Sequence, residues 1–395
     1  MLHLKSAQLS GYKSIKQAEV EFKSGLNIII GKNAVGKTNF LSFLYKLFLF
    51  DYRDIYEEFD SKLLIQNDVL TEIKASRQKP EIGKPIKDLM NFSPILQIVK
   101  REDEEIHFGS EDETLEEGLN YLHKALDLTP IIVRHGIQGG PLLYDSPFAL
   151  KTDLATEVFR YTRDSSLPFF TKCLITSLYR FSAASDQKSP EHLTEFLVKG
   201  SEMVIELVRS SIAEITPVSN VRLSSRFLVV PSEEQGGCFD VSNLFLEYNV
   251  DGVWRLFPQL SSGTQRMIFL IADLVIGGSF SFTANSIEAN RINEGSQIIL
   301  IEEPELGIHP HQLHKLMQLI KEQSEKKQII LTTHSPQVLD ILGADELDRI
   351  VIAKHERTKG TTFHHLSDAQ IKKAKNYMDE TGFLSDYWRF SDLEE

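Results

Sequence analysis

Dense runs of aliphatic residues recur near both ends of the chain, and each is followed by a polar turn. These runs do not alternate between apolar and polar residues as a half-exposed strand does. Continuous apolar runs are typical of strands buried on both faces of a parallel sheet. Such runs occupy Leu26–Ile30, Gln297–Ile301, Gln328–Thr332 and Arg349–Ala353. Apolar residues at helical spacing predict helices from about Lys37 to Phe50 and from about Gly263 to Ile276. This alternation predicts an α/β fold, with a mainly parallel sheet flanked by helices.

The rest of the chain has a different pattern. The N-terminus predicts two short strands, at Leu2–Leu9 and Ala18–Phe22, and hairpins are expected over residues 95–108 and 244–257. Most of the middle is predicted to be helical, over Leu115–Leu128, Asp153–Ser182 and Pro190–Ile215. We therefore expect three parts: residues 1–110, an inserted and largely helical lobe over 111–243, and residues 244–395.

The amino-acid composition limits which partners and which cellular compartment are compatible with this sequence. A net charge of -13 opposes non-specific affinity for DNA over the whole surface, although a local basic groove would remain compatible with it. The two cysteines make a disulfide framework improbable and point to the reducing cytoplasm. No apolar stretch approaches the ~20 residues that a membrane-spanning helix needs, so no membrane partner is expected.

Residues 31–38, GKNAVGKT, match the phosphate-binding pattern G-x-x-x-x-G-K-[ST]. Glycines let such a loop wrap closely around phosphate oxygens, while backbone N–H groups at the start of the following helix face the anion. We expect Lys37 to reach the β- and γ-phosphates of ATP and Thr38 to hold Mg²⁺. A glycine-rich turn with a surface lysine has the same letters, but the strand before it and the helix after it favour a phosphate site. The predicted contacts are Gly31, Asn33, Ala34, Val35, Gly36, Lys37 and Thr38.

Two later apolar runs end in residues suited to phosphate chemistry. One ends in Glu302 and Glu303, where the first carboxylate would support Mg²⁺ and the second would position and deprotonate the attacking water. The other leads to His334, whose imidazole can hydrogen-bond a γ-phosphate and sense its loss. Acidic residues also commonly end strands at the surface, and a histidine at a strand end is usually structural. The preceding phosphate loop favours the catalytic interpretation.

The sequence LSSGTQR, residues 260–266, lies between a predicted hairpin and a predicted helix. Its serines can be plain helix caps. A serine-rich helix N-terminus is also an anion site. If it faces the nucleotide of another subunit, then Ser261, Ser262 and Gly263 close an ATP sandwich between two copies of the chain.

Taken in order, these motifs resemble the RecF/SMC-like branch of ABC ATPases, and more narrowly the OLD-like AAA-domain proteins of prokaryotic abortive infection and DNA repair. The order is GKNAVGKT, LSSGTQR, IILIEEPE, ELGIHP and LTTHSP. The resemblance covers residues 1–50 and roughly 244–353. It implies an ATP hydrolase in which Glu303 is the base, His334 is the switch residue and residues 305–309 line a dimer interface. It also implies that Lys13 and Ser14 lie near the nucleotide and that Gln97 is a candidate metal-side glutamine.

The resemblance further implies a homodimer that closes around ATP and Mg²⁺. The tail of the chain resembles the place where OLD proteins pass into a TOPRIM nuclease, so we expect a nuclease or toxin effector to be a separate polypeptide. Regulation of that effector in anti-phage defence is the favoured function. The alternatives are a RecF-like repair ATPase that clamps DNA and a scaffold that binds ATP with little turnover. A monomeric P-loop kinase would explain neither the signature nor the switch histidine.

Overall fold

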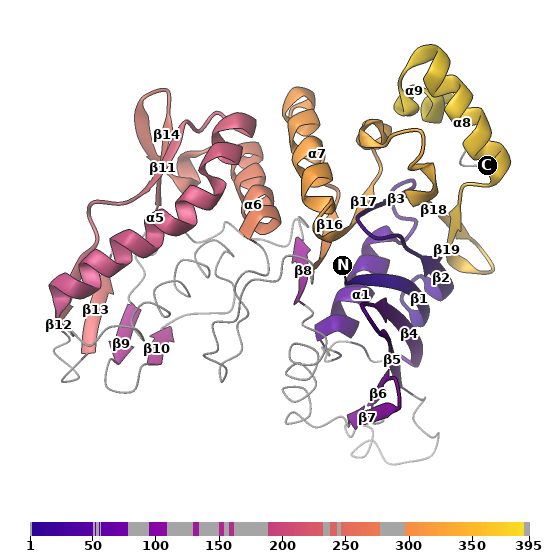
Figure 1. Cartoon of the computed structure of the whole chain (residues 1–395), viewed down its shortest axis with the longest axis horizontal. Coiled ribbons are helices and arrows are strands. Elements are labelled where there is room, and N and C mark those ends of the chain that lie inside the picture. Colours follow the sequence, from indigo (N-terminus) through magenta and orange to yellow (C-terminus); the bar gives the residue numbers. More distant parts are fainter. Residues whose placement is uncertain are drawn as a thin grey trace. The chain divides into compact units, whose positions relative to one another are not determined.

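The protein is described by a computed structural model. The structure describes residues 2–49, 52, 55, 57–77, 95–108, 129–133, 150–153, 158–161, 189–231, 238–242, 246–276 and 297–390. The chain divides into two compact units (Figure 1). The first unit comprises Met1–His135, Asn293–Glu305 and Ile320–Glu395, and the second comprises Gly136–Ile292 and Leu306–Leu319. The predicted helix at Leu115–Leu128 lies outside the described residues.

The first unit is built on a 12-stranded sheet whose central strands are parallel. Three of these strands are buried along nearly their whole length, as their unbroken aliphatic sequences predict. In sheet order, the parallel strands are β18 (Ile350–Glu356), β3 (Leu26–Ile30), β17 (Gln328–Thr333), β16 (Gln297–Glu302) and β8 (Thr129–Val133). The predicted α/β class is confirmed.

The other strands of this sheet pair antiparallel, which corrects the prediction of a mainly parallel sheet: the sheet is mixed, and its parallel part is confined to one side. Several of them alternate between buried and exposed residues, because only one face packs against the core. In β4 and β5 some of the buried positions hold polar residues, such as Ser61 and Thr71, so the sequence does not alternate clearly and these two strands were not predicted. The antiparallel strands are β19 (Gly360–His365), β2 (Ile15–Glu21), β1 (His3–Tyr12), β4 (Phe59–Gln66), β5 (Leu70–Arg77), β6 (Ile95–Arg101) and β7 (Glu104–Phe108).

The helix that follows the phosphate loop, α1 (Lys37–Leu49), is anchored by aromatic side chains. Phe40 and Phe43 are fully buried. The ring of Phe43 stacks on Tyr12 of β1, and the ring of Phe40 packs against Phe363 of β19, each with centroids 4.5 Å apart. This packing fixes the start of α1, and therefore the loop that precedes it, against the antiparallel strands.

The second unit contains α5 (Pro190–Ile215), α6 (Ser262–Ile276) and the first part of α7 (Pro310–Ser324). The helix predicted at Pro190–Ile215 and the hairpin of residues 244–257 are both confirmed. The unit also has a three-stranded and a four-stranded sheet. These consist of β11 (Asn220–Leu223), β14 (Leu246–Val250) and β15 (Val253–Leu256), and of β10 (Val158–Tyr161), β9 (Leu150–Asp153), β13 (Cys238–Ser242) and β12 (Leu228–Pro231).

Strand β10 and the last residue of β9 correct one sequence prediction, because they lie at the start of the segment predicted to be helical over Asp153–Ser182; residues 162–182 of that segment lie outside the described residues. Each strand has only four residues, too few to show a period of two in the sequence. The described part of residues 111–243 therefore holds strands beside its long helix. The three-part division of the chain stays a prediction.

The C-terminal part of the first unit carries four helical elements after β17, two of them before β18 and two after β19. These are the 3₁₀ helices at Pro336–Ile341 and Leu347–Arg349, then α8 (Asp368–Thr381) and α9 (Leu384–Phe390); a further 3₁₀ turn at Phe257–Gln259 lies in the second unit. Among the described helices, none has the length and apolar character needed to cross a membrane.

One buried side-chain amide links a strand of the parallel part of the sheet, β17, to an antiparallel strand, β1. The Gln328 side chain, at the start of β17, is fully buried and makes three hydrogen bonds to backbone groups. Its Oε1 accepts from the Leu4 N–H (2.7 Å), and its Nε2 donates to the carbonyls of Leu4 and Lys23 (2.9 Å each). Because buried backbone groups must be paired, this one side chain satisfies three of them.

Replacing this amide tests its contribution. Gln328→Leu keeps the volume but removes the partner of the Leu4 N–H and of the Leu4 carbonyl, whereas the Lys23 carbonyl keeps its hydrogen bond from the Asn27 amide; we expect it to lower the free energy of unfolding by about 2 kcal/mol. Gln318→Leu, on the exposed face of α7, is the matched control and should change it by less than about 0.5 kcal/mol. Chemical denaturation measures both. Equal midpoints for the two variants would contradict the prediction.

Candidate nucleotide site

The phosphate loop connects β3 to α1, and two of its glycines are required by close contacts. A Cβ atom on Gly31 would lie 2.4 Å from the Ala353 carbonyl, and one on Gly36 would lie 2.2 Å from the Thr361 hydroxyl. Gly36 also has φ of 104°, which side chains rarely tolerate. Asn33 and Ala34 are exposed at the turn of the loop. The glycine spacing recognised in the sequence therefore has a steric cause.

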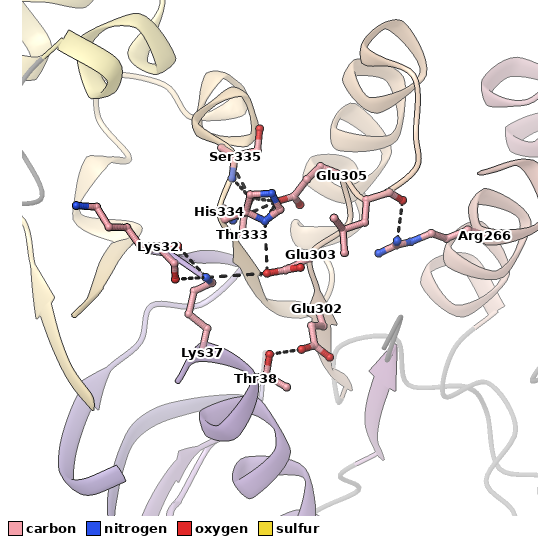
Figure 2. A network of polar contacts seen from close by, with 12 residues as sticks. Lys32, Lys37, Thr38, Arg266, Glu302, Glu303, Glu305, Thr333, His334 and Ser335 are labelled. Atoms are coloured by element: carbon pink, nitrogen blue, oxygen red, sulfur yellow. Dashed lines mark hydrogen bonds and ion pairs between the residues drawn. The ribbon is translucent and has the colours of Figure 1, made fainter. Parts of the chain in front are cut away.

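Lys37 closes the loop. Its side chain is 4% exposed, and its Nζ donates to the carbonyls of Gly31 (2.7 Å) and Lys32 (3.0 Å) (Figure 2). The Glu303 carboxylate lies 4.0 Å from the same ammonium group. A buried cation needs such partners, since its desolvation is otherwise costly.

The next residue, Thr38, contacts the end of β16. Its hydroxyl donates a hydrogen bond to Oε1 of Glu302. Hydroxyl and carboxylate oxygens are the ligand types that Mg²⁺ prefers, and both belong to residues with some solvent exposure. Thr38 and Glu302 are far apart in the sequence, and both were predicted to be metal ligands. The fold brings their side chains together, and their oxygen atoms fit a magnesium ion.

Glu303 points in a different direction from Glu302. Its φ of 43° is unusual for a residue with a side chain, and its N–H donates to the Thr332 carbonyl (2.8 Å). Its Oε1 lies 3.4 Å from Nδ1 of His334 and 4.0 Å from Nζ of Lys37. The carboxylate thus lies between Lys37 and His334, as Figure 2 shows. Backbone strain of this kind is typical of functional sites.

Glu305 has a role here that the sequence analysis did not predict. Its side chain is 7% exposed, and its Oε1 accepts hydrogen bonds from the Thr333 hydroxyl (2.6 Å) and the His334 N–H (3.1 Å). The resemblance implied that Glu305 belongs to a dimer interface. In the structure, it holds the end of β17 that leads to His334, and its place in a dimer interface stays a prediction. The only sequence signal for it is a third glutamate, directly after Pro304.

Ser14 and Lys13 lie in the turn between β1 and β2. The Ser14 hydroxyl lies beside Gly36, since a Cβ atom there would come within 2.6 Å of it. The Lys13 Nζ lies 5.1 Å from the centre of the Tyr12 ring. The structure thus places Ser14 against the phosphate loop, and the nucleotide contacts predicted for both residues stay predictions.

The signature residues begin α6 in the second unit. Ser261 Oγ accepts from the Thr264 N–H (3.2 Å), so the capping interpretation applies to it. Ser261 and Ser262 are both exposed. Within the same unit, Arg266 of α6 donates to the Leu306 carbonyl (2.6 Å), which ties the helix to the segment after Glu305. Contact with a partner's nucleotide stays a prediction.

Gln97 lies in β6, next to the outermost strand β7. In the strand order of the sheet, β5, β4, β1, β2, β19 and β18 stand between β6 and β3, which leads into the phosphate loop. Its assignment as a metal-side residue stays a prediction.

Comparison with known proteins places these features in a family. A model described as "AAA domain, putative AbiEii toxin, Type IV TA system" matches residues 138–340, and one described as "AAA ATPase domain" matches residues 3–84. Septu protein PtuA of Bacillus thuringiensis is 23% identical over 350 residues, which cover 88% of this chain and 75% of that protein. The DNA replication and repair protein RecF of Streptococcus agalactiae is 48% identical over 46 residues, 12% of each chain.

Solved structures support the fold. An Smc head bound to the C-terminal winged-helix domain of ScpA aligns with a TM-score of 0.55 at 14% identity, covering 94% of this chain and 99% of that one. An Smc head from Pyrococcus furiosus aligns with a TM-score of 0.53 at 14% identity, covering 96% and 99%. The resemblance to RecF/SMC-like ABC ATPases is confirmed. Because the first family model spans more than half of the chain, the protein belongs to the family described as "AAA domain, putative AbiEii toxin, Type IV TA system".

Proposed function

We propose that this protein hydrolyses ATP in a head-to-tail dimer, and that its ATP cycle regulates a separate effector, a nuclease or toxin, in prokaryotic anti-phage defence. The observation that carries the ATPase proposal is the position of Glu303 between Lys37 and His334. A carboxylate between a phosphate-binding lysine and a phosphate-sensing imidazole is suited to handle the attacking water.

Binding begins at the phosphate loop. The glycine-containing turn and the N-terminus of α1 present backbone N–H groups to an anion. The Lys37 ammonium, now bonded to two neutral carbonyls, would gain charged acceptors from the β- and γ-phosphates. Thr38 and Glu302 would hold Mg²⁺, which neutralises charge that develops on the phosphates.

Hydrolysis then depends on Glu303 and on the residues that position its neighbours. Glu303 would orient a water molecule and accept its proton. His334, 3.4 Å from Glu303, would contact the γ-phosphate and lose that contact after hydrolysis. Glu305 would keep the histidine in place through the backbone N–H of His334. Contacts made only with ATP bound shift the population toward a closed dimer.

The exposed serines at the start of α6 support the shared site. Helix α6 has 15 residues, and its N-terminal N–H groups and serine hydroxyls form an anion-binding end. In a symmetric dimer, two copies of this end would each cover the phosphate held by the other chain.

The defence role is supported by the family description, which names a toxin and a toxin–antitoxin system, and by the similarity to Septu protein PtuA along most of this chain. The local similarity to RecF supports the alternative of a DNA clamp. That alternative requires ATP-dependent and salt-sensitive DNA binding, against a net charge of -13. A scaffold that only binds ATP would release no phosphate at steady state.

The first prediction concerns the base. Glu303→Gln should lower steady-state phosphate release at least ~100-fold, because the amide cannot accept the proton. ATP binding should persist, so the ATP-bound dimer should accumulate on size-exclusion chromatography. Glu322→Gln, on the exposed part of α7, is the control and should hydrolyse ATP normally. Hydrolysis by Glu303→Gln at the wild-type rate would show that another group is the base.

The second prediction concerns sharing of the site. Lys37→Ala removes the phosphate contact, and Ser262→Glu places a negative charge toward the partner's γ-phosphate while suiting its own helix N-terminus. Each variant alone should be inactive. In an equal mixture, about half of the dimers are mixed and each has one intact site, so about a quarter of wild-type ATPase activity should return. A mixture as inactive as its components would argue against sites shared between chains.

The third prediction concerns Glu305. Glu305→Leu removes the acceptor for Thr333 and His334, and should lower kcat about tenfold or more through misplacement of the histidine. The KM for ATP should change little, because the phosphate loop is untouched. Glu305→Gln keeps an acceptor oxygen and should retain more activity than the leucine variant. Steady-state kinetics of both variants decide this, and an unchanged kcat in Glu305→Leu would remove Glu305 from the mechanism.

A further inference from the structure

Three segments that are distant in the sequence meet behind the phosphate loop. Ser14 comes from the turn between β1 and β2, Asn39 from the first turn of α1, and Thr361 from β19. Thr361 is fully buried and lies 2.8 Å from Ser14, oxygen to oxygen, and 2.8 Å from the carbonyl oxygen of Val35. The Asn39 amide donates to the Ser14 hydroxyl at 2.9 Å.

Counting hydrogens fixes the direction of these bonds. The Val35 carbonyl can only accept, so the single hydroxyl hydrogen of Thr361 is used there. The bond between the two hydroxyls must then run from Ser14 to Thr361. Asn39 in turn donates to Ser14. The bonds form a chain from Asn39 through Ser14 and Thr361 to Val35, within the first unit.

The last bond orients one peptide group of the phosphate loop. The peptide between Val35 and Gly36 is planar and trans, so its N–H points opposite to its C=O. Because the Val35 carbonyl points to Thr361, the Gly36 N–H points away from β19. The missing Cβ of Gly36 lets the Thr361 and Ser14 hydroxyls approach this peptide closely.

We propose that Thr361 is a positioning residue for ATP: its hydroxyl holds the Val35–Gly36 peptide with the N–H turned toward the bound phosphates, and Ser14 supports it. The first four residues of β19 are all buried, and a valine has nearly the same shape as a threonine there but would leave the Val35 carbonyl without this donor. The inference rests on the proposed binding of ATP.

The backbone contact nearby shows that the threonine is held independently of its side chain. The Thr361 N–H donates to the Ser14 carbonyl at 2.9 Å, and Gly360 pairs with Ile15. Removal of the hydroxyl alone therefore leaves β19 attached to the turn between β1 and β2. Thr361→Val therefore tests the contribution of the hydroxyl group.

The experiment compares Thr361→Val with Thr362→Val, the next residue of the same strand, whose hydroxyl bonds Glu356 instead. ATP affinity is measured with Mg²⁺ by calorimetry, and KM and kcat by phosphate release. Thr361→Val should raise Kd and KM about tenfold with kcat changed much less. Thr362→Val should bind as the wild type does. Thr361→Ser, which restores the hydroxyl, should recover the affinity.

A second variant covers the case in which Thr361→Val does not fold. Ser14→Ala, at the turn, breaks the chain one step earlier and should raise Kd about threefold. In the double variant, the two effects should be less than additive, because both act through the same peptide. Wild-type affinity in both Thr361→Val and Ser14→Ala overturns the positioning role. If the wild-type protein binds no ATP, or Lys37→Ala binds it equally well, the proposed function itself is wrong.

Discussion

The structure of the candidate site depends on a buried cation. The Lys37 ammonium group is held inside the phosphate loop by the carbonyls of Gly31 and Lys32, with the Glu303 carboxylate nearby. Removing such a charge from water is costly unless polar partners surround it. The fold supplies those partners from two sides, through the turn after β3 and through the end of β16. The loop is therefore shaped for an anion by interactions within a single chain.

Parallel pairing explains why the other functional side chains lie near this cation. In the sheet, β3 pairs with β17 and β17 pairs with β16, so their carboxyl ends meet at one edge. The register places Thr333 opposite Ile30, and Glu302 opposite Thr332. Ligand sites of α/β sheets commonly form outside the carboxyl ends of the strands. This one arrangement brings the phosphate loop, the two carboxylates and the histidine close together.

Much of the site could be predicted from the sequence, because its main residues directly follow runs of aliphatic residues that are unmistakable. Glu305 and Thr361 could not be predicted in this way. The roles proposed for them depend on which strand ends and turns lie beside them, and a buried threonine in β19 has the same local pattern as a core residue. Strands β4 and β5 escaped prediction because polar residues such as Ser61 and Thr71 occupy some of their buried positions, and β9 and β10 because they are very short. Tertiary contacts, which local patterns do not record, decide these features.

The central claim is that two copies of the chain complete each other's nucleotide sites. The most direct test is a structure of the Glu303→Gln protein with ATP and Mg²⁺, determined by electron cryomicroscopy. The account predicts that the γ-phosphate bound by Lys37 of one copy contacts the Ser261–Gly263 turn of the other. A triphosphate contacted by one chain alone, with that turn remote from any nucleotide, would contradict it.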